Sequence, residues 1–240
     1  MEAIILAGGL GTRLRSVVAD VPKVLVPVGD RPFLDIILAD LKRKGIKCVI
    51  LAVSYLREQI INHVENSDFG LQIDFSVEEQ PLGTGGAIKR ACELCTAENF
   101  FVINGDTFFD VDLPAMMNFS LAHNADITAA AKKMTNFDRY GTLSIDNDFI
   151  VDMKEKMPCA VGYINGGIYC LRRDFILSIP QEKFSFEKDV LEKSYALKNV
   201  CAFISDGYFI DIGIPEDYER AKMELVNSNI CPNVMRAILT

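Results

Sequence analysis

The sequence predicts a single α/β domain, with a mixed, mostly parallel sheet and helices on both faces. Three observations predict this fold class. The chain has 240 residues and half of them are hydrophobic, which suits one large domain with a sizeable core. Short apolar runs alternate with helix-like segments in the first half of the chain. Strand-like runs predominate in the second half, with fewer helices between them.

The elements of the first half follow one another as strand, helix and strand. A short apolar run that ends in glycine predicts a buried parallel strand, and apolar residues at helical spacing predict a helix. This alternation is typical of a Rossmann-like sheet. We expect strands at 3–7, 48–53, 71–77 and 100–104, and helices at 32–44, 56–64 and 87–95.

The second half is expected to add a lobe beside the first. No linker, repeat or low-complexity tract separates the two parts, so we expect one continuous domain over residues 1–240. Its halves are expected near 1–110 and 111–225, with a C-terminal tail at 226–240. We expect strands at 127–131, 141–145, 167–171 and 200–204, and helices at 184–197 and 215–227.

Charge and composition exclude several classes of protein. The net charge of −8 disfavours a general affinity for nucleic acid or anionic membranes. No apolar run approaches the roughly 20 residues that span a bilayer, and no export signal follows Met1. The seven cysteines lie in apolar contexts and indicate reduced core thiols, the Cys92 and Cys95 pair included. We therefore expect a cytoplasmic protein that binds neither nucleic acid nor membrane.

The stretch 6–14, LAGGLGTRL, carries the strongest functional signal. Its glycines let the backbone approach a phosphate closely and direct N–H groups at the oxygens. Arg13 adds a planar cationic group. The loop lacks the Gly-Lys-Ser/Thr ending of a P-loop and the third glycine of a dinucleotide-binding motif, which disfavours a dehydrogenase. In the stretch 21–28, VPKVLVPV, the prolines stiffen an extended segment and hold Lys23 as a rigid phosphate contact.

Together these two stretches resemble the opening of the sugar nucleotidyltransferase family, whose members join a nucleoside triphosphate to a sugar 1-phosphate. The resemblance implies a nucleotidyltransferase fold of the GT-A-like type, a sugar-binding second half and Mg²⁺ as cofactor. It also implies that the glycine loop holds the triphosphate and that an Arg and a Lys act on the transferring phosphoryl group. The implied nucleotide-binding residues are Leu6, Ala7, Gly8, Gly9, Gly11 and Thr12, and the implied catalytic residues are Arg13, Lys23 and Asp106.

Further matches follow in the order of the family. The stretch 78–86, EEQPLGTGG, resembles the loop that reads the base, and 101–106, FVINGD, resembles the strand that supplies one Mg²⁺ ligand. The stretch 209–215, FIDIGIP, resembles the element that supplies the second ligand. The implied residues are Glu78, Glu79, Pro81, Gly83 and Thr84 for the nucleotide, and Asp106 and Asp211 for the metal.

Three short stretches resemble the sugar-phosphate site of the family. They are RYGTL at 139–143, EKMP at 155–158 and NGG at 165–167. The second departs from the Glu-Lys-Pro element of the family because Met157 is inserted before Pro158. The implied sugar-phosphate residues are Gly141, Glu155, Lys156, Asn165 and Gly166.

The residues also fit this chemistry without the analogy. A lone Asp at the end of each of two apolar strands suits a hard divalent cation that keeps several waters. The only histidines, His63 and His123, lie away from every motif, which disfavours a histidine general base. A sugar phosphate is already an ionised nucleophile, so positioning and charge neutralisation suffice.

The base and the sugar follow from chemistry and resemblance together. A carboxylate can accept both donors on the pairing edge of guanine, so the presence of Glu78 and Glu79 predicts GTP as the nucleotide substrate. Glu78 is favoured as the residue that contacts the base. The base loop and the stretch YINGGIY most resemble the guanylyltransferases for D-glycero-D-manno-heptose 1-phosphate, whose product feeds capsule, lipopolysaccharide or S-layer glycans. Mannose 1-phosphate with GTP and glucose 1-phosphate with UTP or dTTP are the alternatives, and dimers or tetramers are common in the family.

Two other classes of function remain open on the sequence. A catalytically silent, nucleotide-sensing subunit could share this fold, although such relatives usually lack the Arg or metal Asp that this chain keeps. A metal-dependent glycosyltransferase would carry an Asp-x-Asp motif, and the stretch 110–112, DVD, has that form. The glycine loop and Lys23 favour synthesis of a nucleotide sugar over its consumption.

Overall fold

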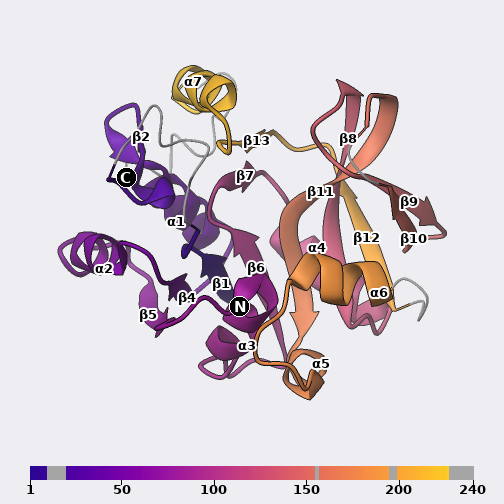
Figure 1. Cartoon of the computed structure of the whole chain (residues 1–240), viewed down its shortest axis with the longest axis horizontal. Coiled ribbons are helices and arrows are strands. Elements are labelled where there is room, and N and C mark those ends of the chain that lie inside the picture. The colour runs from indigo at the N-terminus through magenta and orange to yellow at the C-terminus, as the bar shows by residue number, and fades with distance from the viewer. Residues whose placement is uncertain (10–19, 155–156, 195–198, 227–240) are drawn as a thin grey trace.

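A mixed sheet forms the centre of the protein (Figure 1). The computed structural model describes residues 1–9, 20–154, 157–194 and 199–226. Within these residues, nine strands pair in the order β5-β4-β1-β6-β11-β8-β12-β10-β9. They are β1 (Glu2–Leu6), β4 (Cys48–Val53), β5 (Gln72–Val77), β6 (Asn99–Asn104), β8 (Ile127–Phe137), β9 (Thr142–Asp146), β10 (Phe149–Lys154), β11 (Cys159–Arg172) and β12 (Val200–Ser205). The predicted α/β class is confirmed.

Helices cover both faces of this sheet. They are α1 (Phe33–Arg43), α2 (Arg57–Glu65), α3 (Gly83–Cys92), α4 (Leu113–Ala122), α5 (Arg173–Ser178), the π-helix η2 (Phe186–Leu191), α6 (Glu192–Ser194) and α7 (Pro215–Glu224). Side chains of α1, α2, α4 and α7 share one buried cluster, whereas those of α3, α5 and η2 share another. Among the described residues, no helix is long and apolar enough to cross a membrane.

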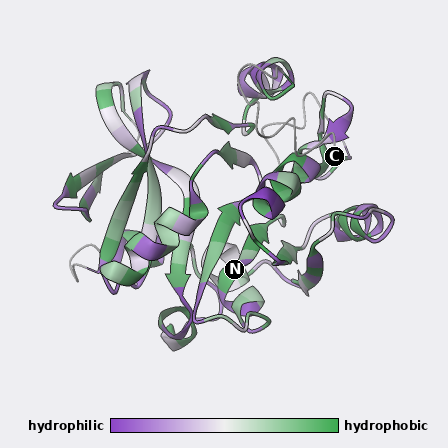
Figure 2. Ribbon diagram, turned by 180° about the vertical axis from the view of Figure 1, so that it is seen from behind, coloured by the Kyte–Doolittle hydropathy of each residue, from purple (hydrophilic) through white to green (hydrophobic). Residues whose placement is uncertain are grey.

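The alternation of side chains along β1 shows why its apolar run is continuous. Ala3 and Ile5 pack into the first cluster, while Ile4 between them packs into the second. All three residues are fully buried. A strand that is covered on both faces needs an apolar residue at every position, which a parallel strand between helices provides. Figure 2 shows the same distribution, with hydrophobic strands at the centre and hydrophilic positions on the outer helices.

Strand direction changes where the two halves of the chain meet. β1 pairs in parallel with both β4 and β6, and β5 is parallel to β4. β11 then pairs antiparallel with β6 and with β8, which joins the second half of the chain to the same sheet. Small ribbons lie beside it. They are the pair β2 (Pro27–Val28) and β3 (Arg31–Pro32), and the antiparallel pair β7 (Thr107–Phe109) and β13 (Phe209–Asp211). A short 3-10 helix, η1 (Lys23–Leu25), precedes β2.

Two predicted helices have different bounds in the structure. The helix expected at 87–95 begins at Gly83 and ends at Cys92, because the N–H groups of Leu94 and Cys95 donate three residues back in a final turn. The helix expected at 184–197 is the π-helix η2 followed by the short α6, and residues 195–198 lie outside the described residues. The expected bounds were wrong because glycine opens α3 and because i→i+5 bonding leaves no periodic pattern.

Several elements were not predicted, among them η1 and the short strands β2, β3 and β7. Two strands were predicted too short, since the strand expected at 127–131 extends to Phe137 as β8. β11 extends over Cys159–Arg172, with a bulge in its pairing to β8, so the strand expected at 167–171 is only its second part. α4, α5 and β10 were missed. α4 is apolar nearly all round and buries Leu113 and Met116, so its sequence shows no one-sided apolar stripe. Asp112, which caps the start of α4, was considered only as part of an Asp-x-Asp metal motif.

Candidate active site

The carboxyl ends of β1 and β6 meet at one edge of the sheet and form the floor of the candidate site. Leu6 lies opposite Asn104 in the parallel pairing. The N–H of Gly105 donates to the carbonyl oxygen of Leu6 over 3.1 Å, and a Cβ at Gly105 would lie 2.5 Å from that oxygen. Only glycine therefore lets the chain turn this close to the end of β1, and Asp106 follows it directly.

Lys23 reaches the same edge from η1. The flanking prolines predicted an extended segment, which is wrong for Lys23–Leu25, because Leu25 N donates to Pro22 O in a tight turn. Proline is compatible with this position, since it precedes the turn and its missing N–H is not needed there. Val24 is buried and anchors the turn. Nζ of Lys23 lies 2.5 Å from Oδ2 of Asp106, and the lysine side chain is only 13% exposed.

Asp211 comes to the same place through the β7–β13 ribbon. In that ribbon Asp211 lies opposite Thr107, and the N–H of Ile212 donates to the carbonyl oxygen of Asp106 over 2.9 Å. Burial raises the pKa of Asp211, and the nearby charge of Asp106 raises it further. A carboxylate pair of this kind is costly without a cation, so the arrangement suits a divalent metal ion. Among the described residues, no three or more His, Cys, Asp and Glu side chains are placed so that together they could hold a metal ion.

Two adjoining cavities open beside these residues. The first, of about 210 Å³, is lined by Leu6, Ala7, Gly9, Lys23, Val24, Thr84, Asn104, Gly105, Asp106 and Glu187. The second, of about 250 Å³, is lined by Leu6, Gly8, Gly9, Ala52, Ser54, Glu78, Pro81, Gly83, Thr84 and Ala87. Leu6, Gly9 and Thr84 line both, so the two cavities are neighbours. They bring together most of the residues predicted for the nucleotide and both of the described residues predicted for catalysis.

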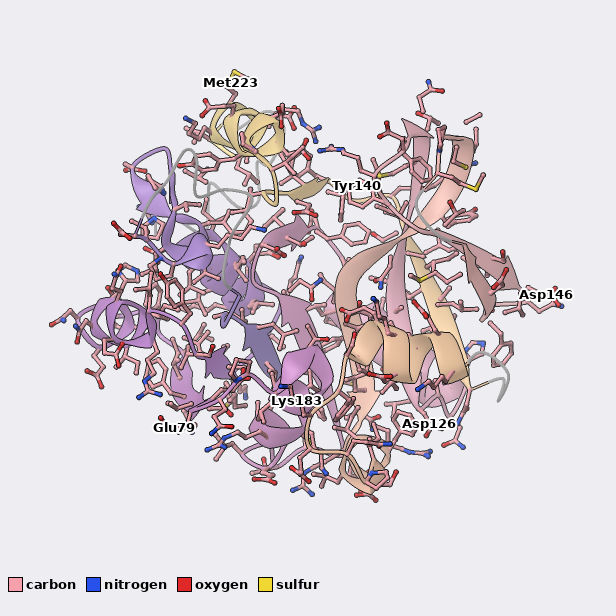
Figure 3. The ribbon with its side chains drawn as sticks, viewed as in Figure 1. Glu79, Asp126, Tyr140, Asp146, Lys183 and Met223 are labelled. Carbon is pink, nitrogen blue, oxygen red and sulfur yellow. The ribbon has the colours of Figure 1, made fainter. Side chains whose placement is uncertain are left out.

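Glu78 and Glu79 have different environments. Glu78 lines the second cavity and is 9% exposed, and its Oε2 accepts from the N–H of Leu82 over 3.0 Å. Burial raises the pKa of Glu78 above its ordinary value. Glu79 lies on the surface, where its carboxylate pairs with Arg57 at 3.2 Å, and Figure 3 places it at the outer edge of the molecule. Only Glu78 lies where a ligand of the cavity could meet it.

The glycines of the loop 83–86 pack against the segment before η2. A Cβ at Gly85 would lie 2.1 Å from the ring of Phe184, and one at Gly86 would lie 2.3 Å from the carbonyl oxygen of Glu182. Gly83 also has a φ of +75°, which favours glycine. The glycine pattern that resembles a base-reading loop therefore also fixes the start of α3 against this segment.

The predicted sugar-phosphate residues are only partly described. Glu155 and Lys156 lie outside the described residues, as do Gly11, Thr12 and Arg13 of the glycine loop. The turn at 165–167 packs against the site, because a Cβ at Gly166 would meet the ring of Phe109 at 2.4 Å and one at Gly167 would meet Asn104 at 2.8 Å. The Nδ2 of Asn165 donates to the hydroxyl of Tyr169 over 2.7 Å.

Gly141 belongs to a loop that borders Asp211. A third cavity, of about 320 Å³, lies there, and it is lined by Asp138, Arg139, Tyr140, Asp211, Gly213, Ile214 and Asp217. Burial raises the pKa of Tyr140 to about 12, and its ring stands edge-on to Phe209 of β13. Figure 3 shows Tyr140 beside β13. This stretch, which directly precedes Gly141, therefore faces the predicted metal carboxylate.

Glu187 lines the first cavity and was not predicted. It lies on η2, far along the chain from the other lining residues, and no short motif in the sequence marks it. A search for carboxylates one turn into a helix with a serine cap would have found it, because Ser185 caps η2 through Lys188 N. That signal is common and carries no function by itself.

Asp110 and Asp112 have structural partners. Asp110 pairs with Arg43 at 3.1 Å and with Lys44 at 3.0 Å, and Asp112 accepts from the N–H of Ala115 at the start of α4. The Asp-x-Asp pattern is thus accounted for by an ion-pair cluster and a helix cap, which counts against the glycosyltransferase alternative. Cys92 and Cys95 are both buried in the second cluster, as expected of core thiols.

Comparison with known proteins agrees with this geometry. The family model described as nucleotidyl transferase matches residues 2–228. D-glycero-alpha-D-manno-heptose 1-phosphate guanylyltransferase of Aneurinibacillus thermoaerophilus is 48% identical over 94% of this chain and 98% of its own. The protein of that name from Campylobacter jejuni is also 48% identical, over 91% and 97%.

A solved structure is similar over nearly the whole chain. The crystal structure of HddC from Yersinia pseudotuberculosis complexed with GMP-PN has a TM-score of 0.84 and 41% sequence identity. The match covers 93% of this chain and 99% of that one. On the family match and on relatives of nearly equal length, this chain belongs to the nucleotidyl transferase family.

Proposed function

We propose that this protein transfers a GMP group from GTP to D-glycero-α-D-manno-heptose 1-phosphate, giving a GDP-sugar and pyrophosphate. The observation that carries this proposal is the convergence of Lys23, Asp106 and Asp211 beside a cavity that adjoins the cavity of Glu78. A phosphate oxygen of the sugar phosphate attacks the α-phosphorus of GTP. The bond from that phosphorus to the bridging oxygen breaks, and pyrophosphate leaves.

The described residues supply charge neutralisation and positioning for this step. The phosphate nucleophile is already ionised, so no general base is required. Lys23 offers a cation at the edge where the phosphates would lie, and the strand-end glycines let the backbone approach them. Arg13 is proposed to act on the same phosphates, and its position lies outside the described residues.

Asp106 and Asp211 are proposed to hold Mg²⁺. Two neighbouring carboxylates gain from a shared cation, and oxygen ligands suit Mg²⁺, which also keeps several waters. When bound, the metal would neutralise charge on the phosphates. The raised pKa of the buried Asp211 supports this fit.

Glu78 is proposed to read guanine. It lines the cavity that adjoins the one beside Lys23 and Asp106. A carboxylate can accept from the N1–H and the 2-amino group of guanine at once, whereas uracil and thymine offer a single donor on that edge. The GMP-PN complex of the similar HddC protein supports a guanine nucleotide.

The sugar assignment rests on resemblance more than on geometry. The proposed contacts are Gly141, Asn165 and Gly166, together with Glu155 and Lys156. The heptose named for the two relatives at 48% identity favours the heptose over mannose. Since the two sugars differ by one hydroxymethyl group, discrimination of about 1–3 kcal/mol is expected unless that group is hydrogen-bonded specifically. We also propose a nucleotide-binding half at 1–110, a sugar-binding half at 111–225 and a cytoplasmic location.

The test is the ratio of kcat/KM for D-glycero-α-D-manno-heptose 1-phosphate and mannose 1-phosphate, with GTP and Mg²⁺ saturating. We expect a clear preference for the heptose with measurable turnover of mannose 1-phosphate. A preference for mannose or glucose 1-phosphate would refute the heptose assignment and leave the reaction class in place.

A further inference from the structure

We propose that Glu187 binds the ribose hydroxyls of the nucleotide and so makes the enzyme select ribonucleotides over deoxyribonucleotides. This inference rests on the proposed function only in that the first cavity takes a nucleoside triphosphate. It does not depend on the base or on the acceptor sugar. Glu187 comes from η2, in a part of the chain that no predicted nucleotide contact occupies.

The position of Glu187 is fixed by Thr84. The Thr84 hydroxyl accepts from the N–H of Phe186 over 2.9 Å and donates to Oε2 of Glu187 over 2.8 Å. Ser185 Oγ lies 3.3 Å from the same oxygen. The carboxylate is therefore held by the serine that caps its own helix and by the start of α3.

The segment that carries Glu187 is itself tightly placed. Gly83 and Gly85 lie so close to Phe184 that a Cβ at either would come within 2.5 Å of it. Phe184 and Phe186 are buried in the second cluster, and the ring of Phe186 stands edge-on to Tyr169 at 5.0 Å. π-helices are rare in proteins, and those that occur are often found at functional sites.

One oxygen of Glu187 has no hydrogen-bond partner among the described residues. Both hydrogen bonds that the carboxylate makes within the described residues involve Oε2. No lysine or arginine in the described ranges forms an ion pair with it. Oε1 is thus an acceptor without a protein partner in this part of the chain, on a side chain that lines the first cavity.

The charge of Glu187 determines which part of a nucleotide it can face. An unpaired carboxylate repels phosphates, so it suits an uncharged group that donates hydrogen bonds. The first cavity is lined by Lys23 and Asp106, and it shares Gly9 and Thr84, the partner of Glu187, with the cavity of Glu78. The part of a nucleotide that joins phosphates to base is the ribose. Its vicinal hydroxyls are the donors that a carboxylate binds, as acidic residues do in dinucleotide sites.

The test compares GTP with 2′-deoxy-GTP and 3′-deoxy-GTP as substrates of the wild type and of Glu187→Ala. A hydrogen bond to a charged group predicts a preference of about 10- to 100-fold in kcat/KM for GTP over at least one deoxy analogue in the wild type. In Glu187→Ala that preference should fall to within about 3-fold. Glu187→Gln, which keeps one acceptor, should lie between them. Thr84→Ser should keep the preference, and Thr84→Val should weaken it.

Glu182→Ala is the matched control. Glu182 belongs to the same segment, but its side chain is 79% exposed and pairs with Lys89. Its substitution should leave the ribose preference unchanged. Thermal unfolding of each variant separates loss of contact from loss of fold.

Three results would overturn the assignment. The first is a wild type that uses deoxy-GTP as well as GTP, and the second is an unchanged preference in Glu187→Ala. The third is a variant whose KM rises only for the sugar phosphate, since the carboxylate would then contact the acceptor.

If the wild type turns over no nucleotide, the proposed function fails. The calorimetric affinities of the protein for GTP and for deoxy-GTP then test the ribose contact, and equal affinities or no binding would count against that contact.

Discussion

The Nζ atom of Lys23 lies 2.5 Å from Oδ2 of Asp106, although the two residues are 83 positions apart in the chain. This ion pair joins the η1 turn to the end of β6. Burial raises the pKa of Asp211 nearby, and the charge of Asp106 raises it further. Lys23 partly offsets that repulsion, so one cation already stabilises the carboxylate pair before any metal or phosphate binds.

The carboxylate pair gives the first prediction. Asp106→Asn and Asp211→Asn should each lower kcat by about 100-fold or more, because each removes charge that acts on the phosphates in the transition state. Arg13→Ala should do the same. Asp211→Asn should also keep or raise the melting temperature in metal-free buffer, because it removes a buried charge that Asp106 repels. Near wild-type turnover in either Asp variant would eliminate the two-carboxylate metal site.

The second prediction concerns Glu78 and pH. Glu78→Gln should lower kcat/KM for GTP by about 10- to 100-fold, because an amide cannot accept both guanine donors. Burial raises the pKa of Glu78 above 4.5, so its ionised fraction falls at mildly acidic pH. The KM for GTP should therefore rise as the pH is lowered toward that pKa.

Two controls accompany the Glu78 experiment. The rise of KM should be weaker in Glu78→Gln, which has no carboxylate to protonate. Glu79→Gln should have little effect on either property, since that side chain pairs with Arg57 on the surface. A stronger effect of Glu79→Gln would reverse the assignment.

Much of the fold could be predicted from local pattern. The strands β1, β4 and β6 are apolar at nearly every position because they are covered on both faces, and their runs end in glycine or polar residues. A helix was predicted where η2 lies, but its π-helical form could not be, since a π-helix has no sequence period of its own. The bulge that divides β11 depends on its pairing with β8 and leaves no local signal.

The third prediction separates two roles of glycine. Gly85→Ala should destabilise the protein by about 1–3 kcal/mol, because the new Cβ would lie 2.1 Å from the buried ring of Phe184. That cost exceeds the gain of about 1 kcal/mol in helix propensity.

Gly9→Ala should leave the melting temperature unchanged, since a Cβ there meets no described atom within 4 Å. The kcat/KM of the Gly9→Ala variant for GTP should nevertheless fall, because Gly9 lines both cavities. Thermal unfolding and kinetics of the two variants check this contrast, and equal stability would contradict it.

The fourth prediction concerns Glu2, which ties β1 to the turn after α3. Its carboxylate accepts from the N–H groups of Thr96 and Ala97 at 2.9 and 3.0 Å. Partial burial alone would raise the pKa of Glu2, but the hydrogen bond from the Thr96 hydroxyl and the two from the backbone N–H groups outweigh it and lower the pKa below 4.5. The stabilisation is therefore fully present above pH 4.5 and is lost as the pH falls through the lowered pKa.

Glu2→Gln should accordingly lower the free energy of unfolding by about 1 kcal/mol at neutral pH. The difference from wild type should shrink in acid. Denaturant unfolding at several pH values measures it, with the exposed Glu93→Gln as control. A difference that grows on acidification would contradict the assigned direction of the pKa shift.

The candidate site was predictable where its residues belong to short ordered motifs. Lys23, Asp106 and Asp211 come together because parallel strand ends share an edge and because β13 pairs with β7. Glu187 was not predictable, because its place in the cavity depends on the packing of η2 against α3. The choice between Glu78 and Glu79 also needed the structure, since neighbouring residues at a strand end point to opposite sides.

The most direct test of the central claim is pyrophosphate release by the purified protein. GTP, ATP, UTP and dTTP are each supplied with Mg²⁺ and with D-glycero-α-D-manno-heptose 1-phosphate. The account predicts rapid release with GTP and much slower release with the other three, and release that requires both the sugar phosphate and the metal. Preferred use of UTP or dTTP would contradict the guanine assignment, and no release with any nucleotide would contradict nucleotidyl transfer itself.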